Sequence, residues 1–96
     1  AEQDPALLIS SEELKNQLGA VTILSVIENA DLSLPLEVDL RIPYSKFDVE
    51  ELSFNADRDH VVICNKGITS YEITQRIKSV HPEFNVVSLD GGIEKF

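Results

Sequence analysis

The strongest constraint on the fold is a repeated exchange between β-branched apolar runs and helical patterns along the chain. Each helical pattern, at residues 10–18 and 70–80, carries apolar side chains spaced three or four residues apart. Strands that alternate with helices through short connections form a mostly parallel sheet covered by helices on both faces. We therefore predict a three-layer α/β fold, with strands at residues 7–9, 21–26, 60–63 and 86–89.

The first helix has signals at both of its ends. Ser10 and Glu13 have the spacing of a capping box, in which the two side chains satisfy free N–H groups at a helix start. Leu14 and Leu18 lie four residues apart and should share one face, and Gly19 can end the helix in a left-handed conformation. The run after it, at residues 21–26, is long enough for a central strand buried on both faces.

The middle of the chain has weaker signals. Residues 27–36 lack a clean period and predict a loop, followed by an extended piece near residues 38–42. Ser45 can cap a short helix through residues 48–52, and residues 55–59 read as a polar connection.

The last third of the chain is the clearest. A strand ends directly on Cys64, and Thr69 or Ser70 can cap the helix that follows. Apolar positions of that helix follow the helical period at Ile73, Ile77 and Val80. A Gly-Gly turn and a short helical piece at residues 93–96 close the chain.

Length and charge exclude several classes of protein. A chain of 96 residues closes one modest core, so residues 1–96 are expected to form a single domain. The first 63 residues hold 13 acidic against 4 basic side chains, which accounts for the whole net charge of −9. Nucleic-acid binders need a basic face, so this class is disfavoured. No apolar run approaches the roughly 20 residues of a membrane helix, so no membrane association is expected.

Cysteine usage narrows the chemistry. Cys64 is the only cysteine, so no intramolecular disulfide can form, and its thiol is either inert or chemically used. Together with the absence of a signal-peptide pattern, this favours a cytoplasmic protein. His60 and His81 are scattered and give no ligand pair with Cys64, so we expect both to be structural, with no metal and no cofactor.

The loop after the third strand carries the candidate chemistry. Cys64 follows the carboxyl end of a parallel strand, where α/β folds place active sites, and it faces the positive end of the next helix. Gly67 lets the loop curl so that successive amides converge on one point, an arrangement that favours the thiolate. Lys66 adds a cation. Thr69 can hydrogen-bond to the sulfur, while Ser70 is better placed to cap the helix.

Six residues at this loop resemble the active-site loop of the rhodanese family. The stretch Cys64-Asn65-Lys66-Gly67-Ile68-Thr69 is similar to Cys-Arg-Lys-Gly-Val-Thr of thiosulfate-using members, departing at Asn65 and conservatively at Ile68. Residues 86–96 also resemble the family's closing signature, a Gly-Gly-Ile motif ending on an aromatic residue. The resemblance implies the rhodanese-like fold, a persulfide intermediate on Cys64, and a donor-binding loop formed by Asn65, Lys66, Gly67, Ile68, Thr69 and Ser70.

The first half of the chain departs from the family pattern. Members usually carry Asp-x-Arg at the end of the second main strand, where this chain has Ser25-Val26-Ile27. The His-Ile-Pro-Gly-Ala stretch of the family is replaced at residues 35–39, and only Ile42-Pro43 and the helix predicted after it remain. The missing arginine often helps to bind small anionic donors, so a protein persulfide is the favoured donor over thiosulfate.

Three functions follow as hypotheses. The leading one is a rhodanese-type sulfurtransferase, in which Cys64 takes sulfane sulfur from a small or protein donor and passes it to a thiol, cyanide or sulfur-carrier protein. The alternatives are a noncatalytic rhodanese-like docking module and a cysteine-loop phosphatase or arsenate reductase, which needs an arginine where this chain has Ser70. Such domains also occur at the C-terminus of larger proteins, including E1-like activating enzymes that sulfurate a carrier, and a chain ending on Phe96 fits that place.

Overall fold

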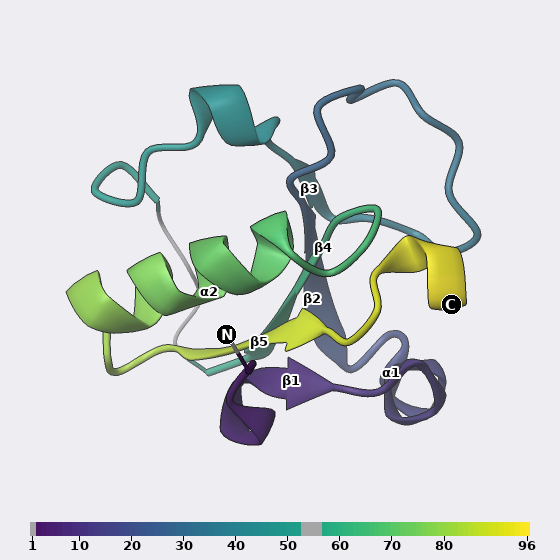
Figure 1. Cartoon of the computed structure of the whole chain (residues 1–96), viewed down its shortest axis with the longest axis horizontal. Helices are drawn as coiled ribbons and strands as arrows, with labels where there is room; N and C mark the ends of the chain where they lie inside the picture. The colour runs from purple at the N-terminus through teal and green to yellow at the C-terminus, as the bar shows by residue number, and fades with distance from the viewer. Residues whose placement is uncertain (1, 53–56) are drawn as a thin grey trace.

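Five parallel strands form the single sheet of the computed structural model, which describes residues 2–52 and 57–96. The strands lie side by side in the order β1-β5-β4-β2-β3 (Figure 1). Every pairing between neighbours is parallel, as the alternation of strands and helices predicts. The strand bounds are β1 Leu8–Ile9, β2 Val21–Ser25, β3 Leu40–Arg41, β4 Asp59–Ile63 and β5 Asn85–Leu89.

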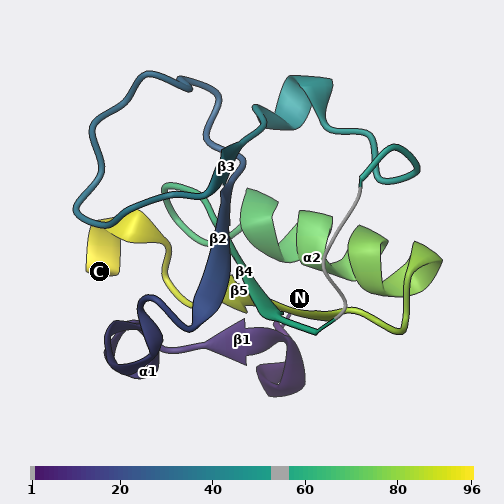
Figure 2. The same ribbon diagram turned by 180° about the vertical axis from the view of Figure 1, so that it is seen from behind.

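Two α-helices cover opposite faces of the sheet. Helix α2 (Thr69–Val80) crosses one face, and the shorter α1 (Ser11–Gln17) packs on the other (Figures 1 and 2). The three-layer α/β architecture is therefore confirmed. Three short 3-10 helices complete the described elements: η1 Pro5–Leu7, η2 Tyr44–Lys46 and η3 Ile93–Lys95.

The two faces of the sheet build two apolar cores because successive side chains of a strand point to opposite sides. Val62 and Cys64 face α2, where they pack with Ile73 and Ile77. Val61 and its alternating neighbours face α1 and pack with other fully or nearly buried side chains, among them Ile9, Leu14, Ile23, Ile63 and Leu89. Strand β4 is thus buried on both faces and is the central strand of the sheet.

Two expectations about the elements are corrected. Strand β2 is flanked by β4 and the two-residue edge strand β3, so it lies next to the centre of the sheet rather than at it. No helix forms at residues 48–52, because the Asp48 carboxylate accepts a hydrogen bond from the Glu50 amide and holds a turn there. The helical turn lies earlier, in η2. Residues 55 and 56 of the expected polar connection lie outside the described residues.

Helix ends account for further differences. Ser10 accepts a hydrogen bond from the Glu13 amide, so the predicted Ser10 cap of α1 is confirmed. The other half of the capping box is not formed, because the Glu13 carboxylate accepts from the Ser10 hydroxyl instead of from a backbone amide. Leu18, however, is 45% exposed while Leu14 is fully buried. Leu18 is the C-cap of α1 and has an extended ψ, so it has left the helical face that Leu14 defines. Val80 is also exposed, since it is the last residue of α2.

Within residues 2–52 and 57–96, no helix has the length and apolar character that spanning a membrane requires.

Candidate functional site: a sulfur-centred loop between β4 and α2

The candidate site lies between the ends of β2 and β4, where the connections that follow the two strands run to opposite sides of the sheet. From β2 the chain continues to β3 on one side, and from β4 it continues through α2 to β5 on the other. Parallel sheets form a crevice at such a switch point, outside the carboxyl ends of the strands. Cys64 follows β4 directly at this point and is 6% exposed.

Two backbone amides hold the sulfur of Cys64. The Gly67 N–H and the Ser70 N–H donate to Sγ at 3.1 and 3.3 Å. Gly67 has φ +84, and only a residue without Cβ fits here, because a Cβ would lie 2.9 Å from the Gly91 nitrogen. Since Ser70 is in the first turn of α2, the sulfur also lies at the positive end of the helix dipole. Both features stabilise a negative charge on the sulfur.

A buried hydroxyl, that of Ser70, also reaches the sulfur. Ser70 Oγ lies 3.2 Å from Cys64 Sγ and 2.7 Å from Ser88 Oγ of β5. Neither expected role is therefore observed: Ser70 rather than Thr69 contacts the sulfur, and neither side chain caps α2. Thr69 is the first residue of α2 and lines the open pocket, and the N-cap, Ile68, makes no side-chain capping bond. Ser70 lies one position further along the helix, which points its side chain at the sulfur instead of at the helix end.

Other backbone N–H groups of the loop have no hydrogen-bond acceptor among the described residues. Among the residues that the structure describes, none accepts a hydrogen bond from the backbone amides of Asn65, Lys66, Ile68 or Thr69. All four residues line the pocket above the sulfur. Free amides on a curled loop at a helix start form a ready site for an anionic atom.

The closing Gly-Gly turn supports the loop from behind. The amide of Ile93 donates to the Cys64 carbonyl at 2.8 Å, and the amide of Glu94 donates to the Asn65 carbonyl at 3.1 Å. Gly92 packs so closely that a Cβ there would lie 2.4 Å from the Asn65 oxygen. The side chain of Gln3 donates to the Gly67 carbonyl at 3.0 Å. The two stretches that carry the sequence resemblance, the loop and the closing turn, are thus one structural unit.

A pocket of about 400 Å³ opens above the loop. Besides the loop it is lined by residues that the sequence did not single out, namely Val26, Ile27, Glu28, Tyr44 and Glu94. Tyr44 and Ile68 are large apolar side chains at this pocket that are more than half exposed. The position of β2 beside β4 could have indicated residues 26–28, because strand ends at one edge of a parallel sheet lie together.

The charges of this pocket have mixed signs. Lys66 is a lining cation, while Glu28 and Glu94 are lining carboxylates. The Glu28 carboxylate is held in place by hydrogen bonds from the backbone amide and the hydroxyl of Ser45. Where rhodaneses carry Asp-x-Arg, the Ser25 hydroxyl accepts a hydrogen bond from the Ile27 amide, and Ile27 is buried.

Arg41 does not replace the missing arginine. Its Nη1 donates to the carbonyls of Ala30 and Leu32 at 3.0 and 2.8 Å, so the guanidinium ties down the long loop after β2. It is not among the residues that line the pocket of Cys64.

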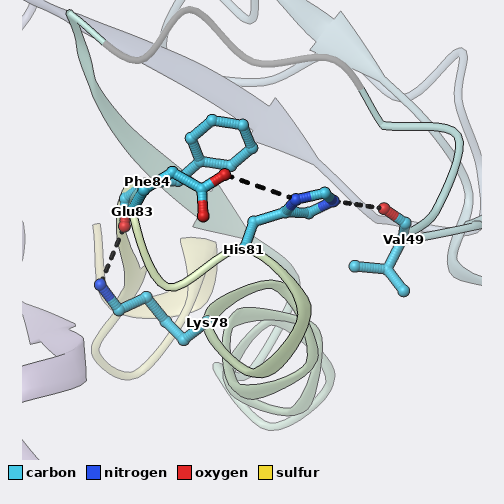
Figure 3. Close-up of polar contacts among 5 residues, drawn as sticks. All are labelled: Val49, Lys78, His81, Glu83 and Phe84. Carbon is cyan, nitrogen blue, oxygen red and sulfur yellow. Dashed lines mark hydrogen bonds and ion pairs between the residues drawn. The ribbon is translucent and has the colours of Figure 1, made fainter.

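Neither histidine lines the pocket of Cys64, and each contacts a backbone carbonyl. His60 is 1% exposed, and its Nδ1 donates to the Asn85 carbonyl. Burial lowers the pKa of His60 below its ordinary value, since the charged form would lose its hydration. His81 ends α2, where its Nε2 donates to the Val49 carbonyl at 3.1 Å and its Nδ1 lies 3.7 Å from the Glu83 carboxylate (Figure 3). Nearby, Lys78 donates to the Phe84 carbonyl and closes the turn after the helix.

The described part of the chain brings together no group of three or more histidine, cysteine or acidic side chains that could hold a metal ion.

Comparison with known proteins agrees with this geometry. No protein-family model and no curated protein sequence matches the chain. Solved structures do match. A rhodanese homolog from the extremely thermophilic bacterium Thermus thermophilus has a TM-score of 0.71 at 22% identity, covering 93% of this chain and 99% of its own. A rhodanese-like domain protein from Staphylococcus aureus has a TM-score of 0.72 at 22% identity, covering 92% and 88%. A rhodanese-related protein from Thermoplasma volcanium has a TM-score of 0.71 at 26% identity, covering 90% and 85%.

The fold and the loop together define a parallel α/β protein with a cysteine at the carboxyl end of its central strand. The structural matches assign it further. The chain has the rhodanese-like fold.

Proposed function

We propose that the chain is a sulfurtransferase that carries sulfane sulfur as a persulfide on Cys64. The observation that supports this most is the environment of the Cys64 sulfur. Cys64 Sγ lies at the start of α2 within hydrogen-bond distance of two amides and one hydroxyl, at the floor of an open pocket. Cys64 also packs against apolar side chains of α2, but amide and hydroxyl donors around the sulfur are typical of a nucleophilic cysteine rather than of a purely structural one.

The reaction proceeds in two displacement steps. The Cys64 thiolate attacks the outer sulfur of the donor, a new S–S bond forms, and the donor's own S–S bond breaks to release a thiolate or sulfite. The outer sulfur of the resulting persulfide carries the negative charge. An acceptor nucleophile, such as a thiolate or cyanide, then attacks that outer sulfur, and the Cys64 thiolate leaves with its electron pair. No net oxidation or reduction is needed from any other reagent.

The loop amides suit the second sulfur as well as the first. Gly67 and Ser70 already donate to Sγ, and Asn65, Lys66, Ile68 and Thr69 have amides without a described protein partner. We propose that these amides receive the outer sulfur of the persulfide. They would stabilise the intermediate without a side-chain cation.

Pocket charge favours a protein donor over thiosulfate. A thiosulfate dianion would enter a chain of net charge −9, past the carboxylates of Glu28 and Glu94, with Lys66 as its attractive partner. A protein persulfide brings its own contact surface, and the exposed Tyr44 and Ile68 at the pocket offer apolar area for it. The acceptor would be a thiol or a sulfur-carrier protein, and a thiolate-dependent reaction suits the reducing cytoplasm.

Intact mass spectrometry tests the proposal. After incubation with thiosulfate or a persulfidated protein, the chain should gain the mass of one sulfur atom, and a reducing agent should remove it. Cys64→Ser should gain nothing, because a hydroxyl is a far weaker nucleophile near neutral pH, while its thermal unfolding should stay close to that of the wild type. A chain that never gains sulfur from either donor would be a docking module instead.

A further inference from the structure

Three buried groups from three different elements form a row behind the reacting sulfur. Cys64 Sγ of the loop lies 3.2 Å from Ser70 Oγ of α2, which lies 2.7 Å from Ser88 Oγ of β5. Cys64 is 6% exposed, and both serines are fully buried. The buried residues of β5 are Val86, Ser88 and Leu89, and of these Ser88 alone has a polar side chain. A buried hydroxyl in such a strand is costly unless it is hydrogen-bonded.

Counting hydrogens shows which protonation state this row fits. The row contains two contacts, Cys64 to Ser70 and Ser70 to Ser88. With a neutral thiol there are three hydrogens, one on each group, and only two contacts to receive them. Within residues 2–52 and 57–96, neither hydroxyl has a further hydrogen-bond partner. One donor of the thiol form is therefore left without an acceptor, which carries a cost in a buried place.

The thiolate removes this mismatch. It leaves two hydrogens for two contacts, so that Ser88 donates to Ser70 and Ser70 donates to the charged sulfur. A persulfide has the same count, since Sγ then carries no hydrogen either. A hydroxyl whose oxygen already accepts a hydrogen bond is also a stronger donor, because bonds in a chain polarise one another.

We infer that Ser88 is a positioning residue for the chemistry of Cys64, and that it acts through Ser70. The Ser88 hydroxyl donates a hydrogen bond to the Ser70 oxygen, so that the Ser70 hydroxyl hydrogen points toward the sulfur. The inference rests on the proposed function for its role in sulfur transfer, but the ionisation of Cys64 can be measured without any sulfur donor.

The test is the rate of Cys64 alkylation by iodoacetamide as a function of pH, which follows the thiolate fraction. In Ser70→Ala the midpoint of the profile should rise by about one pH unit, as expected for the loss of a hydrogen bond to a charged group. In Ser88→Ala it should rise by about 0.3 unit, the share due to polarisation and positioning. Ser88→Thr keeps the hydroxyl and should retain the wild-type midpoint.

A matched control is Thr74→Val, which removes a buried hydroxyl one turn further along α2. Thr74 donates to the Ser70 carbonyl rather than to the row, so the midpoint should not move. The charged and titratable groups of the pocket, Lys66, Glu28, Glu94 and Tyr44, are the same in every variant, so their influence on the profile cancels.

The decisive comparison is Ser88→Ala in two backgrounds. Because Ser88 acts through Ser70, its effect should vanish when Ser70 is already alanine. A shift that persists in that background, a wild-type profile for Ser88→Ala, or an equal shift for Ser88→Thr would overturn the inference. If these shifts appear in a chain that accepts no sulfur, the proposed function fails while the hydroxyl row stands.

Discussion

Replacement of Gly92 by alanine should damage both the stability and the chemistry of the site. Gly92 has φ +68 and ψ −171, a region that essentially only glycine occupies and that costs another residue about 1–3 kcal/mol. A Cβ there would lie 2.5 Å from the Asn65 carbonyl carbon and 2.6 Å from the Gly67 nitrogen, and neither backbone atom can turn away as a flexible side chain could. Overpacking of this kind adds about 1–3 kcal/mol, so the total loss should be about 2–6 kcal/mol.

The matched control for this substitution is Gly19→Ala. Gly19 has φ +89, yet nothing lies within 4 Å of a Cβ built on it. Its loss should therefore be the conformational part alone, about 1–2 kcal/mol. For a chain of this length, whose total stability is about 5–14 kcal/mol, the difference between the two variants is large.

Urea unfolding of wild type, Gly19→Ala and Gly92→Ala measures this difference. With a slope of about 2 kcal/mol per molar urea, Gly92→Ala should unfold about 1 M earlier than Gly19→Ala. The Cys64 loop must shift to make room, so Gly92→Ala should also lose alkylation rate near neutral pH, whereas Gly19→Ala should keep it. Equal unfolding midpoints and equal alkylation rates in the two variants would refute the close packing of turn and loop.

Two further predictions concern donor choice and pH. Lys66→Ala should slow the loading of Cys64 by thiosulfate more than its loading by a persulfidated protein. Lys46→Ala is an equal charge change outside this pocket and should slow neither donor selectively. Equal sensitivity of both donors to Lys66→Ala would contradict the argument that the pocket favours a protein donor. Burial lowers the pKa of His60 in the folded chain, so the unfolded chain binds more protons as the pH falls below about 6.5, and the free energy of unfolding should fall there. His60→Gln should show a smaller fall between pH 7.5 and 5.5 in urea titrations, and a fall as large as that of the wild type would assign the effect to other groups.

The sequence predicted the strands and the loop well because both depend on local signals. β-branched runs bounded by polar residues mark buried parallel strands, and Gly67 marks the one place where the loop needs positive φ. The sequence did not predict which of two neighbouring side chains faces the sulfur. Thr69 and Ser70 are neighbours with similar chemistry, and only the position of α2 determines that Ser70 faces the sulfur.

Ser88 and the pocket walls show what needed tertiary information. A serine inside an apolar strand was a visible irregularity, but its partner Ser70 lies 18 residues earlier in the chain and on a different element. Glu28, Tyr44 and Glu94 come together only because β2 lies next to β4 and the chain ends against the loop. Such pairings depend on strand order, which the alternation of elements leaves open.

The hydrogen-bonding groups around Cys64 lie almost entirely in the last third of the chain. This explains how the Cys64 loop can keep its structure although the first half departs from the rhodanese sequence pattern. Among residues 2–52 and 57–96, the groups that hydrogen-bond to the sulfur or to its loop come from residues 64–96, apart from the Gln3 side chain. The end of β2 forms only the opposite wall of the pocket, through Val26, Ile27 and Glu28. Under the proposed function, changes in that wall would alter which donor can approach, and they would remove no hydrogen bond to Cys64. Under the proposed function, the groups that bind the donor and the groups that hold the persulfide therefore lie on separate parts of the chain. The wall carries a carboxylate, Glu28, beside the position where thiosulfate-using rhodaneses carry an arginine.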